Sequence, residues 1–272
     1  MTAAARAPSR KISLSLSHDH SHGLLSYLEM GPADGPCVVF LHGFGADLLT
    51  WQLCLVPLAA RYRLIALDLP GHGRSTADVG AADLAFMTRW LDEACDVLRV
   101  PEAHFVGHSM GGKIALGFAR DHAHRVRSLA LISPAGLGGE FHLDTLDAFL
   151  SDTTYSEGLA KQLVGPRGAN LVSAMAKSLA EARQDEARQA AMQKMLGQSR
   201  AYGLALSPEG FDWSQIRVPV TILWGDHDRL IPMPDTRRLP PHAPVHVIEG
   251  AGHLPHMEAS GDVVAVLKEF LR

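Results

Sequence analysis

The chain has 272 residues, of which 47% are hydrophobic and 20% charged, so it can bury one large α/β core. Lys and Arg number 25 and Asp and Glu 29, a formal net charge of −4, and no basic cluster interleaved with aromatic residues occurs. We therefore expect no nucleic-acid partner. No run approaches the roughly 18 apolar residues that span a bilayer, and residues 1–10 do not resemble a secretory signal, so we expect a soluble protein without a membrane partner.

The three cysteines also bear on the compartment. Cys37, Cys54 and Cys95 are scattered and odd in number, and none forms a Cys-x-x-Cys pair. Disulfide frameworks use even numbers of cysteines, and zinc sites use closely spaced ones. We therefore expect a cytoplasmic location, no metal and no cofactor.

The chain is expected to open with a half-exposed β-hairpin. Ile12, Leu14 and Leu16 alternate with serines, and residues 24–29 form a second strand candidate. The connecting loop is expected to hold a cluster of potential metal ligands: His18, Asp19, His20 and His22. Such a loop is usually solvated, and because no second ligand cluster accompanies it we expect no metal there.

Continuous apolar runs then predict strands buried on both faces of a parallel sheet, at residues 37–41, 63–67, 103–106, 126–132, 218–224 and 245–249. Helical periodicity falls between and after these runs, at about residues 47–60, 82–98, 113–119 and 262–271. This alternation is typical of a doubly wound α/β sheet. Every strand after the opening hairpin is expected to run parallel.

The alternation stops between about residues 136 and 202. No strand is predicted there, and apolar side chains recur at helical spacing. We expect an α/β core of residues 1–135 and 206–272, divided by an all-helical lid at residues 136–205. Most apolar side chains of the lid are expected to pack within the lid itself. Since both its ends leave strand ends, the lid should lie over that edge of the sheet.

The segment Gly107–Gly112 follows a predicted strand and opens a predicted helix, and it contains Gly-x-Ser-x-Gly centred on Ser109. Glycines on both sides permit a sharp turn in which the serine adopts strained backbone angles and projects its hydroxyl from the sheet edge. The positive end of the helix dipole faces Ser109. These features favour a nucleophile, and the alternative is a serine that only caps the helix.

A serine nucleophile needs a base, and the base needs a carboxylate to orient it. Two segments supply them at the ends of later strands, Gly225–Arg229 and Gly250–His253, in the chain order Ser, Asp, His expected for this turn. We predict that His253 is the base and that most other histidines lie at the surface or at helix caps. Asp226 and Asp228 are both candidate acids, and we favour Asp228 because Asp226 can cap the turn.

Together with His42–Gly45 and Asp68–Ser75, these motifs resemble the α/β-hydrolase superfamily over nearly the whole chain. The resemblance implies an eight-stranded, mostly parallel sheet with a helical lid after the sixth strand, and it points to Asp228 as the acid. It also implies an oxyanion hole made by the backbone amides of Phe44 and Met110. Each such donor lowers the barrier by on the order of 3 kcal/mol.

Three segments are similar to a narrower group, the hydrolase-like portion of the dihydrolipoyl acetyltransferase components of acetoin dehydrogenases. They are Val106–Leu116, Leu131–Gly138 and Gly250–Glu258. Members of that group usually carry an N-terminal lipoyl domain, which we do not expect here. Acetyl transfer to lipoamide is therefore not the first expectation.

The expected function is hydrolysis of small carboxylic esters or thioesters through an acyl-Ser109 intermediate. Phe44, Leu137, Phe141 and Leu146 are expected to form the acyl pocket. The alternatives are an acyltransferase with a thiol or alcohol acceptor, a hydrolase of carbon–carbon bonds next to a ketone, and a non-catalytic ligand-binding module. Haloalkane dehalogenases and epoxide hydrolases of this fold use an aspartate nucleophile, so the serine at position 109 disfavours them.

Overall fold

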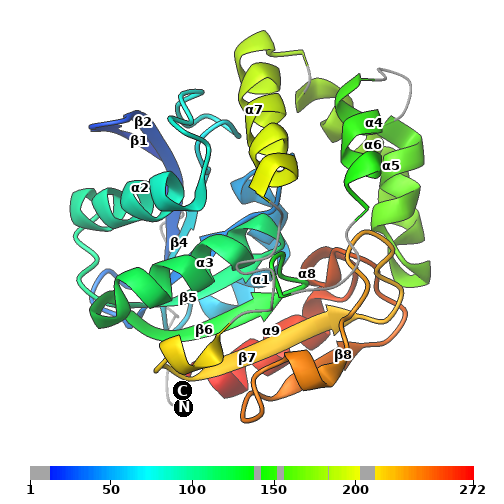
Figure 1. Cartoon of the computed structure of the whole chain (residues 1–272). Helices are drawn as coiled ribbons and strands as arrows, with labels where there is room; N and C mark the ends of the chain where they lie inside the picture. Colours follow the sequence, from blue (N-terminus) through cyan, green and yellow to red (C-terminus); the bar gives the residue numbers. More distant parts are fainter. Residues whose placement is uncertain (1–12, 138–141, 152–155, 183, 203–211) are drawn as a thin grey trace, which may run out of the picture.

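The structure, a computed structural model, describes residues 13–137, 142–151, 156–182, 184–202 and 212–272. Its centre is an eight-stranded sheet in the order β1-β2-β4-β3-β5-β6-β7-β8 (Figure 1). The strands are β1 (Ser13–His20), β2 (Gly23–Met30), β3 (Cys37–Leu41), β4 (Arg63–Leu67), β5 (Ala103–His108), β6 (Val126–Ile132), β7 (Val220–Gly225) and β8 (Val245–Ile248). β2 pairs antiparallel with β1 and β4, and all other neighbours pair parallel, which confirms the expected fold.

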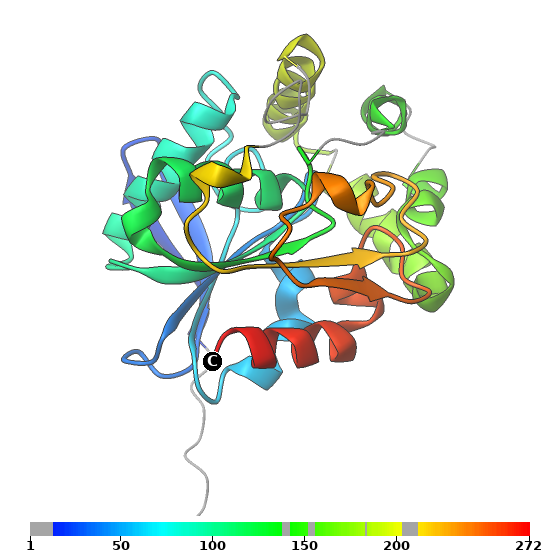
Figure 2. The same cartoon turned by 60° about the horizontal axis from the view of Figure 1, so that its bottom comes forward.

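Helices cover both faces of this sheet. Figure 2 shows α1 and α9 on one side of it and α2 and α3 on the other. These four helices are α1 (Gln52–Leu58), α2 (Leu84–Val97), α3 (Met110–Asp121) and α9 (Ser260–Phe270). In β3, Val39 and Leu41 join the hydrophobic cluster on the α2 and α3 side, whereas Val38 and Phe40 join the cluster on the α1 and α9 side. Burial on both faces explains why the parallel strands are continuously apolar.

Local backbone features set where the helices begin. The first expected helix is divided into a 3₁₀ turn, η1 (Leu48–Trp51), which Asp47 caps, and α1. α2 starts after Ala82, whose φ of 57° is incompatible with a helix, and the Asp83 side chain accepts the Phe86 amide at 2.7 Å. α3 begins directly after Ser109, earlier than the periodicity predicts.

The hairpin differs from the sequence expectation. His18, Asp19 and His20 belong to β1 and not to a loop, because the pairing with β2 continues until His20 lies opposite Gly23. Gly23 has a φ of 98°, which allows the tight turn at residues 21–22. The side chains of residues 13–20 lie outside the described part of the chain, so the expectation that this segment binds no metal remains a prediction.

Between β6 and β7 the described residues form helices and no strand. They are α4 (Leu143–Ser151), α5 (Ser156–Leu163), η3 (Pro166–Leu171), α6 (Val172–Ala182), α7 (Glu186–Tyr202) and, just before β7, η4 (Trp213–Gln215). Figures 1 and 2 show α7 standing between α2 and the group formed by α5 and α6. The fold therefore has the expected helical insertion after the sixth strand.

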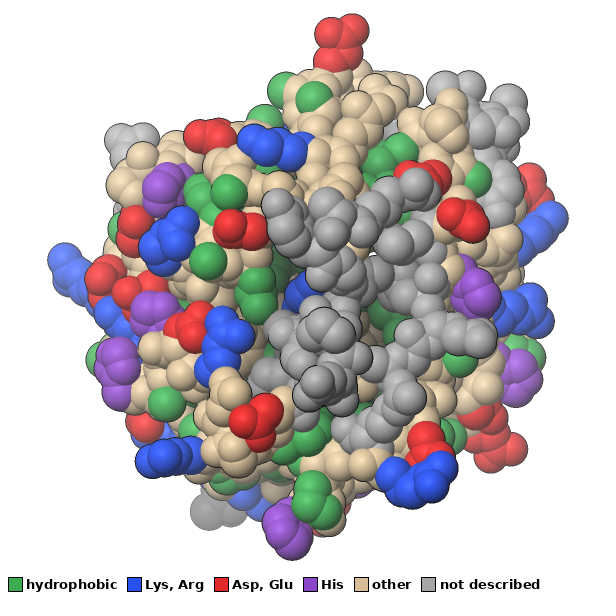
Figure 3. All heavy atoms as spheres, in the orientation of Figure 1, with side chains coloured by type: hydrophobic (Ala, Val, Ile, Leu, Met, Phe, Trp, Pro, Cys, Tyr) green, Lys and Arg blue, Asp and Glu red, His purple; other side chains and the backbone are tan. Residues whose placement is uncertain are grey.

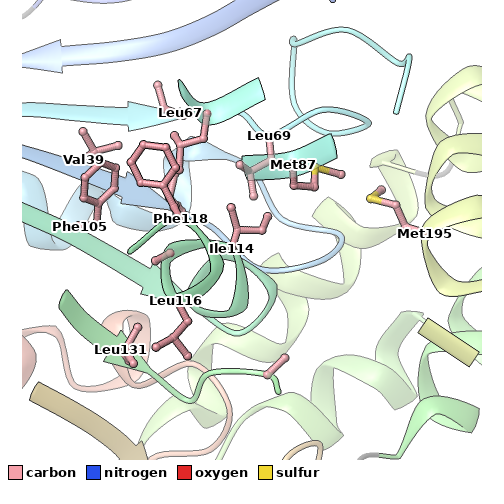
Figure 4. Close-up of a cluster of buried hydrophobic side chains, with 14 of the residues drawn as sticks. Val39, Leu67, Leu69, Met87, Phe105, Ile114, Leu116, Phe118, Leu131 and Met195 are labelled. Carbon is pink, nitrogen blue, oxygen red and sulfur yellow. The ribbon is translucent and has the colours of Figure 1, made fainter. Parts of the chain in front are cut away.

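The insertion does not have a separate core. Its buried side chains, among them Leu146 and Met192, form one cluster with the core on the α2 and α3 side. Figure 4 shows Met195 extending from α7 toward Met87 of α2. A Cβ added at Gly71, in the loop after β4, would lie 3.0 Å from Met195 Cε. The insertion is therefore packed onto the core, and the share of its apolar side chains that pack within the insertion stays a prediction.

The surface and the thiols are consistent with the composition. Acidic and basic side chains are intermixed on the face seen in Figure 3. No helix in the described part of the chain is long and apolar enough to cross a membrane. The three cysteines are free, and burial raises the pKa of Cys37 to about 11 and of Cys54 and Cys95 to about 12. None of these thiols is therefore a ready nucleophile at neutral pH.

Candidate active site

The turn between β5 and α3 is made by Ser109 alone. Its backbone angles are φ 50° and ψ −114°, which a residue with a side chain adopts only under strain. A Cβ added at Gly107 would lie 2.6 Å from the Gly111 carbonyl oxygen, and one added at Gly111 would lie 2.2 Å from that of Leu41. The Ser109 hydroxyl makes no capping hydrogen bond to α3. The strained turn therefore forms as expected, and its geometry argues against a serine that only caps the helix.

Asp228 and His253 come together from the loops after β7 and β8. Asp228 Oδ2 lies 2.8 Å from His253 Nδ1, and both side chains are buried. The other carboxylate oxygen, Oδ1, accepts the amides of Leu230 at 3.0 Å and Ile231 at 2.9 Å. With both oxygens accepting, the carboxylate selects the tautomer of His253 that is protonated on Nδ1. Nε2 of His253 is thereby left able to accept a proton.

Asp226, the other candidate acid, has different partners. Its Oδ1 accepts the Gly250 amide at 2.7 Å and lies 2.8 Å from His227 Nδ1 in an exposed position. The hydrogen bond from His227 lowers the pKa of Asp226. Asp226 thus joins the turn after β7 to the turn after β8 across 24 positions, which differs from the local cap that the sequence suggested.

His108, which precedes Ser109, connects the serine turn to His253. Its Nε2 donates to the His253 carbonyl oxygen at 2.8 Å, and the two rings lie 4.8 Å apart. Within the described residues, neither the Ser109 hydroxyl nor His253 Nε2 has a hydrogen-bond partner. Because catalytic hydrogen bonds are often long without substrate, this arrangement remains compatible with proton transfer between them.

The loop after β3 passes against Ser109. A Cβ added at Gly43 would lie 2.7 Å from His108 Nδ1 and 3.2 Å from Ser109 Cβ. Met110 is the first residue of α3, so its amide has no partner inside the helix. Neither the Met110 amide nor the Phe44 amide donates to any acceptor in the described parts of the chain. Two unpaired amides on segments that meet at the serine are the donors that an oxyanion hole requires.

Two buried histidines hold this loop in place. His72 Nε2 accepts the Gly45 amide, and His42 Nε2 accepts the Leu69 amide, both at 3.0 Å. Each ring also donates from Nδ1 to a backbone carbonyl, at 2.7 Å for His42 and 3.0 Å for His72. Both rings must therefore be neutral, and burial lowers the pKa of His42 to about 4 and of His72 to about 3.

The sequence did not single out these supporting histidines or His108 and His256. His108 and His256 are also fully buried, with ring centroids 4.5 Å apart, and burial lowers the pKa of His256 to about 3 and that of His108 well below its usual value. His42, His72 and His108 do lie inside the recognised motifs. Placement in a motif beside a strand end was the available signal that they are not surface residues.

The expected pocket residues are only partly described. Leu137 and Leu146 are buried in the cluster on the α2 and α3 side, and Phe44 packs against that cluster. Phe141 lies outside the described residues. The acyl pocket therefore stays a prediction.

Comparison with known proteins places the chain in a family. A family model of the alpha/beta hydrolase fold matches residues 36–260. As the sequence resemblance predicted, the chain is similar to the dihydrolipoyllysine-residue acetyltransferase component of the acetoin cleaving system of Cupriavidus necator. The two are 36% identical over 242 residues, which cover 86% of this chain and 63% of that protein. The chain thus spans less than two thirds of that relative's length.

Two further relatives match over most of their length. A 2-hydroxy-6-oxononadienedioate/2-hydroxy-6-oxononatrienedioate hydrolase of Burkholderia vietnamiensis is 31% identical over 261 residues, with 86% of each chain covered. The crystal structure of a membrane phospholipase A, a bacterial virulence factor, has a TM-score of 0.84 and 29% identity, over 96% of this chain and 86% of that chain. From the family match and these relatives, the chain belongs to the alpha/beta hydrolase fold family.

Proposed function

We propose that the chain is a serine hydrolase that cleaves small carboxylic esters or thioesters through an acyl-Ser109 intermediate. The observation that carries this proposal is the buried Asp228–His253 pair, with 2.8 Å between Oδ2 and Nδ1, at the same sheet edge as the strained turn at Ser109. Hydrolases and an acyltransferase component among the relatives support an enzyme. The ester or thioester specificity is our own inference.

In the proposed reaction, Ser109 Oγ attacks the acyl carbon while His253 Nε2 takes the hydroxyl proton, and Asp228 stabilises the imidazolium from Nδ1. The amides of Phe44 and Met110 donate to the oxyanion that develops on the acyl oxygen. His253 then protonates the departing alcohol or thiol. Water, deprotonated by the same histidine, attacks the acyl-Ser109 ester and releases the acid.

The helical insertion is proposed to act as a lid over this site. Leu137 and Leu146 of the insertion share one apolar cluster with Met195, and Phe44 packs against it. Methionine adapts its shape readily, which suits a wall that meets acyl groups of different length. Closure of such a lid would exclude water and strengthen the oxyanion interactions.

Two relatives favour specific alternatives that use the same serine. Acyl transfer to a thiol or alcohol has support from the 36% identity to the acetyltransferase component. Hydrolysis of a carbon–carbon bond next to a ketone has support from the 31% identity to the dienedioate hydrolase. A non-catalytic module is the remaining alternative, because a fold alone does not fix a function. The proposed partner is a small acyl compound, without nucleic acid or membrane, and three free thiols favour a cytoplasmic setting.

A substrate series separates the ester or thioester hydrolase from the acyltransferase and from the non-catalytic module. The purified protein is assayed on p-nitrophenyl esters and matched thioesters from acetyl to octanoyl, with and without an added thiol acceptor, beside Ser109→Ala. Hydrolysis that needs Ser109 and is unaffected by the thiol supports the proposal. If the added thiol causes the acyl group to appear as a new thioester instead of the free acid, the chain is an acyltransferase. If the protein turns over none of these compounds and a fluorophosphonate does not label Ser109, the chain is not a serine hydrolase.

A further inference from the structure

The loop that carries His253 is closely joined to the insertion. The His253 amide donates to the carbonyl oxygen of Leu163, at the end of α5, at 2.7 Å. A Cβ added at Gly252 would lie 2.5 Å from both Leu163 O and Gly165 N. The backbones therefore touch without intervening side chains.

The Glu258 carboxylate bridges the two segments. Its Oε2 accepts the Gly165 amide of the insertion at 2.7 Å. On the other side, the Gly252 amide lies 2.9 Å from Oε1 and 3.0 Å from Oε2, and the Leu254 amide lies 3.1 Å from Oε1. Gly252 and Leu254 flank His253. One carboxylate thus holds the backbone on both sides of the candidate base and ties it to the insertion.

With these contacts, nearly every polar group of His253 has a fixed partner. Its amide donates to Leu163, its carbonyl accepts from His108 Nε2 at 2.8 Å, and its Nδ1 pairs with Asp228 at 2.8 Å. Nε2, the atom that the proposed reaction uses, is the one left unbonded among the described residues. Glu258 holds the two neighbouring amides of this frame.

We propose that Glu258 is a positioning residue: it fixes the His253 loop to the insertion and thereby aims Nε2 of His253 at Ser109. This inference rests on the proposed function of Ser109 and His253. A carboxylate suits the position because three amides converge on it and both of its oxygens accept, whereas a glutamine would turn an NH₂ donor toward at least one of them. The insertion and the His253 loop are therefore linked where residues 163–165 contact residues 252–258.

Glu258→Gln tests the role of the carboxylate. Displacement of a catalytic group by about 1 Å can cost on the order of 100-fold in rate, so we expect kcat to fall about 10- to 100-fold. KM should stay within about threefold of the wild-type value, since substrate contacts are not removed. The matched control is Asp262→Asn, which weakens an exposed ion pair between Asp262 and Arg167 of the insertion. It leaves the amides around His253 unchanged. The control should retain wild-type kcat.

A second variant displaces the carboxylate and keeps its charge. A Cβ added at Gly168 would lie 2.6 Å from Glu258 Cγ and 2.7 Å from Oε2, so Gly168→Ala must push the side chain aside. This variant should lower kcat in the same direction as E258Q. If E258Q is not recovered as folded protein, the kcat of Gly168→Ala tests the proposal in its place.

A double-mutant cycle with His253→Ala separates positioning from general destabilisation. If Glu258 acts through His253, the E258Q penalty on kcat disappears when His253 is already absent, measured as residual cleavage of an activated ester. An equal penalty in both backgrounds overturns the proposal, as does wild-type kcat in both E258Q and Gly168→Ala. Failure of the proposed function would look different, because the wild type would then turn over no ester, or Ser109→Ala would retain full activity, whatever occupies position 258.

Discussion

Replacement of Asp228 by Asn should change which nitrogen of His253 carries the proton. Asp228 Oδ1 accepts two buried amides, at 3.0 Å and 2.9 Å, and Oδ2 faces His253 Nδ1 at 2.8 Å. An asparagine has one acceptor oxygen, and it must choose between the two sides. If its NH₂ faced the two amides, two buried donors would be unsatisfied at about 1 to 3 kcal/mol each. The asparagine oxygen therefore stays on the amides, and the NH₂ faces Nδ1.

The NH₂ group then donates to Nδ1 and forces the proton of the neutral imidazole onto Nε2. In that tautomer His253 cannot accept the Ser109 proton. We expect kcat to fall by about 10⁴, which is about 5 kcal/mol of transition-state stabilisation. Steady-state hydrolysis of a p-nitrophenyl ester measures the loss, and circular dichroism checks that the fold is intact.

Asp226→Asn is the matched control on the same turn. Asp226 is partly exposed and bonds Gly250 and His227, not His253, so its replacement should change kcat by no more than about threefold. If Asp226→Asn proves more damaging than Asp228→Asn, or if the latter keeps more than about a tenth of wild-type kcat, Asp228 is not the triad acid.

Three other perturbations have defined outcomes. Ser109→Ala and His253→Ala should each lower kcat by about 10⁴ to 10⁶ with little change in melting temperature, and a near-normal rate in either would remove that residue from the mechanism. Burial lowers the pKa of His72 to about 3 from 6.5, so the unfolded chain binds more protons than the folded chain between those values. The free energy of unfolding, from urea titrations, should therefore rise with pH across that window and level off above it, and the rise should be smaller in His72→Gln. A free energy of unfolding that does not change across the window contradicts a buried neutral ring. Leu146→Ala or Phe141→Ala should shift the preference toward longer acyl chains while a small fluorophosphonate still labels Ser109, and an unchanged order of preference means that the acyl group binds elsewhere.

The features that the sequence predicted well depend on local patterns. Buried strands and the Gly-x-Ser-x-Gly turn both follow from residues adjacent in the chain. The expectation that the loops after β7 and β8 meet near Ser109 needed one additional step, that parallel strands bring their carboxyl ends to one edge. The structure then joined Asp228 and His253, although 25 positions separate them.

The features that the sequence missed depend on long-range contacts. Glu258 bonds Gly165, 93 positions away, and no spacing rule relates the two. The extent of the opening hairpin was missed for a similar reason, because cross-strand pairing, and not the alternation of side chains, carries β1 as far as His20. His72 bonds Gly45, in the loop after β3, across 27 positions, which only the folded chain reveals.

In the proposed reaction an acyl group becomes attached to Ser109. Rapid acid quenching after the protein is mixed with an activated ester, followed by mass spectrometry of the intact chain and its peptides, detects this attachment. We expect a transient mass increase equal to the acyl group on the peptide that contains Ser109. The increase should accumulate when deacylation is slow and be absent from Ser109→Ala. Turnover without such an adduct under conditions where deacylation limits the rate, or an adduct on another residue, would contradict it.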